Sequence, residues 1–135
     1  DVYKRQVSHI SPTIILKDGQ PFMALGAAGG DKIVTAVVQV ISRIMDQQMS
    51  LEGALAAGRV HPDRNGGMDL EVHDGIDWSE EDFDFLTEDG LLIDAEARTA
   101  RFGRVHAVMY DQAKNQWQAA ADPDWEGTAA GVSKH

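Results

Sequence analysis

Two short segments of this chain carry groups that suit the chemistry of a developing negative charge. Ser8 and His9 stand before an apolar run, and Gly29 and Gly30 stand directly before a helical pattern. The start of a helix presents backbone N–H groups without helical partners and the positive end of the helix dipole. The glycine pair could therefore hold an oxyanion, with Ser8 and His9 as polar side chains at the other end of the same hairpin. The residues alone favour a plain strand-to-helix turn, in which glycine only supplies flexibility.

A hairpin and a helix must position these segments. The runs 13–17 and 21–25 are rich in β-forming residues and flank Asp18-Gly19, which is a strong turn signal. From residue 32 to about residue 48, apolar residues recur at helical spacing. Many of them are β-branched, so the helix needs packing against a sheet. Asp31 is the expected N-cap of this helix.

The rest of the chain alternates strands and helices. Ser50 is the expected cap of a short helix that ends at Gly58, and Ser79 is the expected cap of an acidic helix that Gly90 follows. Alternation predicts a half-exposed strand in which Leu70 faces inward and Glu71 faces solvent. Further strands are predicted at 91–93, 105–110 and 116–120. The pattern predicts an α+β fold.

Composition narrows the possible partners. The chain has 135 residues, 43% of them apolar, and a formal net charge of −10. This balance argues against nucleic acid or an anionic membrane as a partner, and no apolar run has the length of a membrane span. The histidines show no metal-ligand spacing, so we expect no metal site and no cofactor. The absence of cysteine leaves the redox compartment open.

Several motifs in the same order resemble the C-terminal part of the small subunit of gamma-glutamyltransferases, which are N-terminal-nucleophile hydrolases. Family members carry a Ser-Ser-Met-Ser-Pro-Thr stretch, a strand, a Lys-Asp-Gly turn, a second strand, and a Gly-Ser-Pro-Gly-Gly loop before a helix. The matching segments here are 8–13, 17–19, 26–30, 57–61, 103–108 and 121–123. The likeness covers roughly residues 8–131, and the order of the motifs is more specific than any one of them.

The resemblance implies a fold and four site residues. It implies that the chain is one portion of a four-layer αββα sandwich. Gly29 and Gly30 align with the glycine pair whose amides form the oxyanion hole, and Ser8 and His9 align with the serine pair that grips the α-carboxylate of the substrate. A protonated imidazole can still bind a carboxylate, so we expect weaker binding as pH rises. The alternative is that His9 packs beside the pocket.

The implied reaction is hydrolysis or transfer of γ-glutamyl groups from amides such as glutathione. A self-cleaving precursor exposes an N-terminal threonine as the nucleophile. Thr13 and Thr35 are internal, so we expect the nucleophile to be missing from this chain and the chain alone to be inactive. The large subunit of the same precursor is the expected protein partner.

Arg59 is expected in an ion pair, and His61 in a structural role.

Two other interpretations stay open. His9 replaces a hydroxyl, and Ala27 and Ala28 stand where many members have Ser and Pro, which allows an amidohydrolase or acylase with another acyl specificity. A non-catalytic acidic binding module is the alternative from a different class.

Residues 1–6 read as the translation of a sequencing-library adapter. We therefore expect 1–6 to be an artefact and 7–135 to be the portion of the small subunit.

Overall fold

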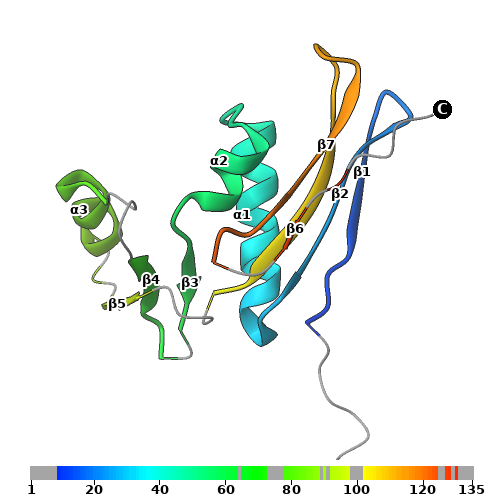
Figure 1. Cartoon of the computed structure of the whole chain (residues 1–135). Coiled ribbons are helices and arrows are strands. Elements are labelled where there is room, and N and C mark those ends of the chain that lie inside the picture. The colour runs from blue at the N-terminus through cyan, green and yellow to red at the C-terminus, as the bar shows by residue number, and fades with distance from the viewer. Residues whose placement is uncertain are drawn as a thin grey trace, which may run out of the picture.

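The computed structural model describes residues 9–63, 65–72, 78–88, 90, 92–97, 102–124, 127–128 and 130. It shows two sheets and three α-helices (Figure 1). A four-stranded antiparallel sheet has the order β1-β2-β6-β7 and a three-stranded sheet has the order β3-β4-β5. The strands are β1 (Thr13–Lys17), β2 (Gln20–Ala28), β3 (Val60–Pro62), β4 (Met68–Val72), β5 (Ile93–Ala97), β6 (Arg104–Asp111) and β7 (Gln116–Ala121). The helices are α1 (Ile33–Met45), α2 (Leu51–Ala56) and α3 (Glu80–Glu88), and the α+β prediction is confirmed.

The predicted hairpin forms β1 and β2. Asp18 and Gly19 have φ values of 53° and 76°, which are the left-handed angles of a tight hairpin turn. β2 runs on to Ala28, three residues beyond the predicted end at Leu25. This extension pairs with β6, where Gly26 lies opposite His106 and Ala28 lies opposite Arg104. The strand therefore ends directly at Gly29.

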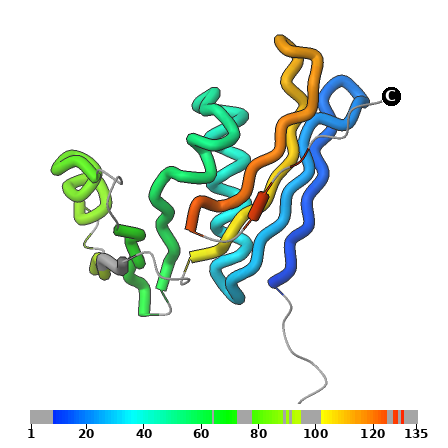
Figure 2. The backbone as a smooth tube through the Cα atoms, in the orientation of Figure 1, coloured from blue at the N-terminus to red at the C-terminus, as the bar shows by residue number. Residues whose placement is uncertain are grey.

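One face of the four-stranded sheet carries the core. α1 and α2 cover this face, and the backbone trace shows them between the two sheets (Figure 2). The buried core side chains come from the sheet and both helices: Met23, Leu25, Ile33, Ala36, Val37, Val40, Ile44, Leu51, Ala54, Leu55, Val105 and Ala107. The opposite face is exposed, with Ile14 74%, Val108 40% and Trp117 54% accessible. Burial of the α1 stripe thus compensates for its β-branched residues.

Two predicted helix ends differ from the structure. Asp31 is not the N-cap of α1, because a 3-10 turn, η2 (Gly30–Lys32), includes it and Lys32 is the N-cap. Ser50 caps α2 as predicted, with its hydroxyl accepting from the Gly53 N–H. Gly58 is not left-handed and Ala57 is extended. The guanidinium of Arg43 instead donates to the carbonyls that follow α2, including that of Ala57 at 3.1 Å.

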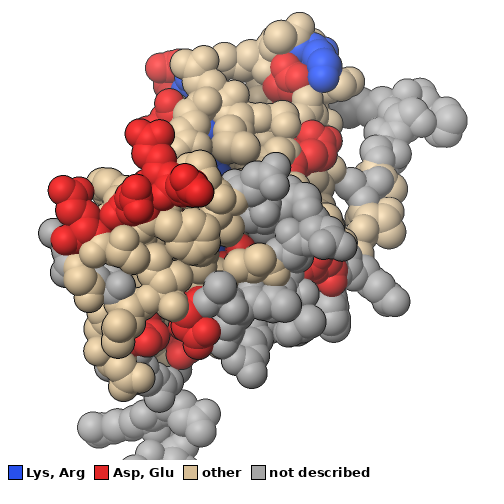
Figure 3. All heavy atoms as spheres, turned by 90° about the vertical axis from the view of Figure 1, so that its left-hand side faces the viewer, with Lys and Arg blue, Asp and Glu red and all other residues tan. Residues whose placement is uncertain are grey.

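Acidic side chains gather on the face that carries α3 (Figure 3). Glu80, Glu81 and Asp82 occupy the first turn of this helix, where negative charge is favourable. Ser79 and Asp82 cap each other, since each backbone N–H donates to the other side chain. None of the helices in the described residues is long and apolar enough to cross a membrane.

Candidate functional site

The glycine loop between β2 and α1 needs its two glycines for different reasons. Gly29 has φ 139° and Gly30 has φ 66°, angles that residues with a side chain rarely adopt. A Cβ on Gly29 would lie 2.9 Å from the Cα of Gly103, so the two backbones are in direct contact. Among the residues that the structure describes, a Cβ on Gly30 would meet nothing within 4 Å. Gly29 is therefore fixed against the protein, and the described residues leave the Cβ side of Gly30 open.

Gly103 holds the other side of this contact. Its own Cβ would lie 2.8 Å from the Cβ of Ala36 and 2.9 Å from the carbonyl oxygen of Lys32. The strand start before β6 is thus wedged between the glycine loop and the first turn of α1. No sequence signal marked Gly103 as part of the site, because the residues it contacts are distant along the chain.

The structure describes only part of the predicted carboxylate-binding pair. Ser8 lies outside the described residues. His9 is half-buried, and its carbonyl oxygen accepts a hydrogen bond from the Ser11 hydroxyl at 3.1 Å. Ser11 therefore supports the segment before β1. Neither threonine that the sequence left unassigned is terminal: Thr13 begins β1, and Thr35 lies in the first turn of α1.

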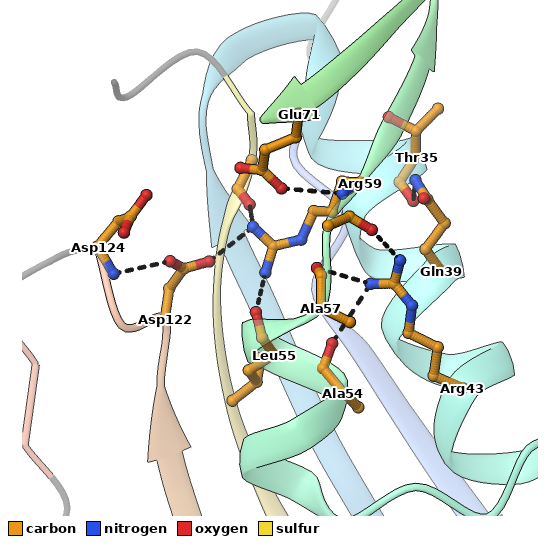
Figure 4. A network of polar contacts seen from close by, with 12 residues as sticks. Thr35, Gln39, Arg43, Ala54, Leu55, Ala57, Arg59, Glu71, Asp122 and Asp124 are labelled. Carbon is orange, nitrogen blue, oxygen red and sulfur yellow. Dashed lines mark hydrogen bonds and ion pairs between the residues drawn. The ribbon is translucent and has the colours of Figure 1, made fainter. Parts of the chain in front are cut away.

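A buried ionic network is centred on Arg59 (Figure 4). Arg59 is 1% exposed and pairs with Asp122 across 2.7 Å. Its guanidinium also donates to the carbonyl oxygens of Leu55 at 2.7 Å and Gly103 at 3.0 Å. Its backbone N–H donates to the Glu71 carboxylate at 2.9 Å. The expected ion pair of Arg59 is confirmed, and through Gly103 the network reaches the backbone that touches Gly29.

The prediction that Glu71 faces solvent is wrong. Glu71 is fully buried, and its carbonyl oxygen accepts from the indole N–H of Trp78 at 2.8 Å. Strand alternation assumes that one face of β4 is exposed to solvent, but the Glu71 carboxylate lies inside the protein and accepts from the Arg59 backbone N–H. Among the described residues, no group of three His, Asp or Glu side chains could hold a metal ion.

A second polar cluster surrounds the first turn of α1. The Thr35 hydroxyl donates to the Lys32 carbonyl oxygen at 3.1 Å and lies 2.9 Å from Nδ1 of His61. Because the hydroxyl has one proton, Nδ1 of His61 is assigned as the donor in the second bond. His61 therefore has the structural role that was expected.

The cluster should make stability depend on pH. Burial, and then the charge of Lys32, lower the pKa of His61 from its ordinary 6.5, against the opposing effect of Asp31 and Asp69. The unfolded chain then binds the extra proton first as pH falls through 6.5, so stability is lost below that pH. We expect urea midpoints measured between about pH 7.5 and about pH 5.5 to fall less in His61→Gln than in the parent. An equal fall of the urea midpoint over this pH range in the parent and in His61→Gln would contradict this expectation.

Comparisons of this chain with a family model, with curated sequences and with solved structures point to the same protein family. The family model described as Gamma-glutamyltranspeptidase matches residues 2–132. A glutathione hydrolase proenzyme of Pseudomonas aeruginosa is 43% identical over 58 residues, which are 43% of this chain. One from Bacillus subtilis (strain 168) is 26% identical over 131 residues, or 96% of the chain. The solved gamma-glutamyltranspeptidase from Pseudomonas nitroreducens superposes with a TM-score of 0.79 at 26% identity, covering 96% of this chain and 65% of that chain.

The matched relatives are much longer than this chain. The alignments span 10% of the Pseudomonas aeruginosa protein and 21% of the Bacillus subtilis protein. These two relatives therefore match this chain over a small part of their own length. The family model, in contrast, matches nearly all of this chain.

Proposed function

This chain belongs to the gamma-glutamyltranspeptidase family, and we propose that it is the C-terminal part of the small subunit of an enzyme that hydrolyses or transfers γ-glutamyl groups. The observation that carries the proposal is the geometry of the Gly29–Gly30 loop. Gly29 is held against Gly103, while in the described part of the chain nothing lies within 4 Å of a Cβ position on Gly30. Such a loop presents backbone donors to a ligand without side chains in the way. Relatives named glutathione hydrolase support an amide of glutathione type as the substrate.

In the proposed reaction, an N-terminal threonine from the remainder of the precursor attacks the γ-carbonyl carbon of the donor. Its α-amine takes the hydroxyl proton and passes it to the leaving amine. The tetrahedral oxyanion rests on the Gly29 and Gly30 amides, where each donor contributes about 3 kcal/mol in comparable sites. Ser8 and His9 bind the α-carboxylate of the γ-glutamyl group. Water or an amino acid then accepts the acyl group and releases the threonine.

We also propose the four-layer αββα arrangement, with the remainder of the precursor completing it. The face of the four-stranded sheet opposite to α1 and α2 supports this, because it exposes Ile14, Val108 and Trp117. A groove of about 680 Å³ runs over this face between β1, β2, β6 and β7. An exposed apolar sheet face of this kind needs a cover. The large subunit of the same precursor is the proposed partner.

A second candidate function is an amidohydrolase or acylase of the same fold with a different acyl specificity. His9 favours it, since an imidazole replaces a hydroxyl at the predicted carboxylate-binding position. Ala27 and Ala28 lie in the last two positions of β2, directly before the glycine loop. They make the approach to the loop differ from the Ser-Pro pattern of many members.

We propose further that residues 1–6 are an adapter translation and that the family portion is 7–135. Sequencing of the gene through this region tests this proposal.

Comparing the 135-residue chain with the complete reading frame tests the proposal. The isolated chain should not hydrolyse a chromogenic γ-glutamyl anilide, because the proposed nucleophile belongs to the remainder of the precursor. The complete protein should give two bands on a denaturing gel and should hydrolyse the anilide. A single inactive band would contradict the proposal and favour the non-catalytic binding module. Turnover by the isolated chain would place the nucleophile within these residues.

A further inference from the structure

Lys32 ties the glycine loop to the second sheet. It follows Gly30 by two residues, in η2, and its Nζ lies 2.5 Å from Oδ2 of Asp69 in β4. The two side chains are only 13% and 16% exposed. The same ammonium lies 4.3 Å from the ring centre of Phe102, which is 3% exposed and precedes Gly103. One side chain thus joins the loop, β4 and the segment in contact with Gly29.

This pair differs from an ordinary surface ion pair. Exposed pairs contribute little, because solvent screens them and both side chains must be ordered. Lys32 and Asp69 are both mostly buried, and the Phe102 ring limits where the ammonium can lie. The backbone of Lys32 is also held, since its carbonyl oxygen accepts from Thr35 and packs against Gly103. The ammonium group and the backbone of Lys32 are therefore both held in place.

The glycine loop needs such an anchor. Gly29 and Gly30 gain backbone freedom from the lack of a side chain, so an ordered loop must be held by its surroundings. Lys32, the N-cap of α1, makes no side-chain capping bond, and η2 has only three residues. Donors aimed at an oxyanion are effective only when they are fixed before the reaction.

We propose that Lys32 and Asp69 are positioning residues for the oxyanion-binding loop, an inference that rests on the proposed function of Gly29 and Gly30. Neither residue contacts the substrate in this account. Their pair holds η2 in place, so that the amides of the loop keep the geometry that the transition state requires. The anchor therefore acts on the rate of the chemical step and leaves substrate binding nearly unchanged.

Substitutions in the complete protein test this. Lys32→Met keeps the length and the packing on Phe102 but removes the charge, and Asp69→Asn removes the partner charge. We expect each to lower kcat per titrated active site about tenfold with KM changed less than about twofold, as for a slightly misplaced site. Lys32→Arg should recover most of the activity. Lys114→Met is the matched control, because it breaks a 3.4 Å pair with Asp111 in which the lysine side chain is 63% exposed.

Amide hydrogen exchange gives a readout that does not need activity. In Lys32→Met and Asp69→Asn, the amides of residues 29–32 should exchange about tenfold faster than in the parent, and those of β6 should not change. Unchanged exchange at the loop, or equal kcat per active site in all variants, would overturn the inference. If the parent shows no γ-glutamyl turnover, the proposed function fails, and the exchange result alone decides whether the pair holds the loop.

Discussion

Replacing Gly29 with alanine in the complete protein should lower kcat for γ-glutamyl transfer by about 10²–10³-fold, the usual effect of losing one oxyanion donor. The added Cβ would lie 2.9 Å from the Cα of Gly103, and both partners are backbone atoms that cannot rotate away. The loop must therefore shift as a whole. The value of φ, 139°, adds strain for any residue with a side chain.

Alanine substitutions at two other glycines separate the steric clash with Gly103 from the backbone strain at positive φ. Gly66 has φ 87°, no described residue lies within 4 Å of its Cβ position, and it lies between β3 and β4. Gly66→Ala should therefore cost about 1–2 kcal/mol of stability and leave kcat unchanged. Gly30→Ala introduces the strain without the clash, so kcat should fall less than in Gly29→Ala. The measurement is steady-state hydrolysis of a γ-glutamyl anilide per titrated site. Equal kcat in Gly29→Ala and the parent would contradict the account.

Replacing Arg59 with methionine should lower the free energy of unfolding by about 3–5 kcal/mol, the usual cost of breaking a buried ion pair. The substitution leaves the buried Asp122 carboxylate without the guanidinium that lies 2.7 Å away. It also removes the donors to the carbonyl oxygens of Leu55 and Gly103. Because Gly103 contacts Gly29, activity should fall together with stability.

Urea unfolding of the complete protein measures this effect. Lys114→Met removes an ion pair whose lysine is exposed to solvent. It should change the free energy of unfolding, obtained from the urea midpoint, by less than about 1 kcal/mol. The double variant Arg59→Met/Asp122→Leu should recover part of the loss, because it no longer leaves a buried charge without its partner. A loss below about 1 kcal/mol for Arg59→Met alone would show that the network is not a main support of the fold.

Local sequence signals predicted the elements where local chemistry decides them. The Asp18-Gly19 turn, the Ser50 cap and the helical spacing of Ile33, Val37 and Ile44 in α1 lie where the pattern placed them. The signals failed where a distant residue decides. Val34, Val38 and Met45, which the same pattern assigns to the apolar stripe, are exposed. Asp31 lies within a 3-10 turn whose Lys32 carbonyl packs against Gly103, and the buried Glu71 carboxylate accepts from the Arg59 N–H.

The candidate site shows the same division. The order of the motifs indicated Gly29 and Gly30, but it could not show that only Gly29 is in contact with another backbone. That contact depends on Gly103, which is far along the chain. The positions of Ser8 and His9 relative to a substrate depend on parts of the protein outside the described residues. Their role in binding the α-carboxylate stays a prediction.

The acyl specificity of the self-cleaved complete protein is the most direct test of the central claim. kcat/KM should be compared for a γ-glutamyl anilide and for an anilide of the same length that lacks the α-carboxylate. We expect the γ-glutamyl substrate to be preferred by at least about 100-fold, since a site built for a charged group rejects the analogue without it. Self-cleavage with equal or reversed preference would contradict γ-glutamyl transfer and would favour the acylase alternative that His9 suggests.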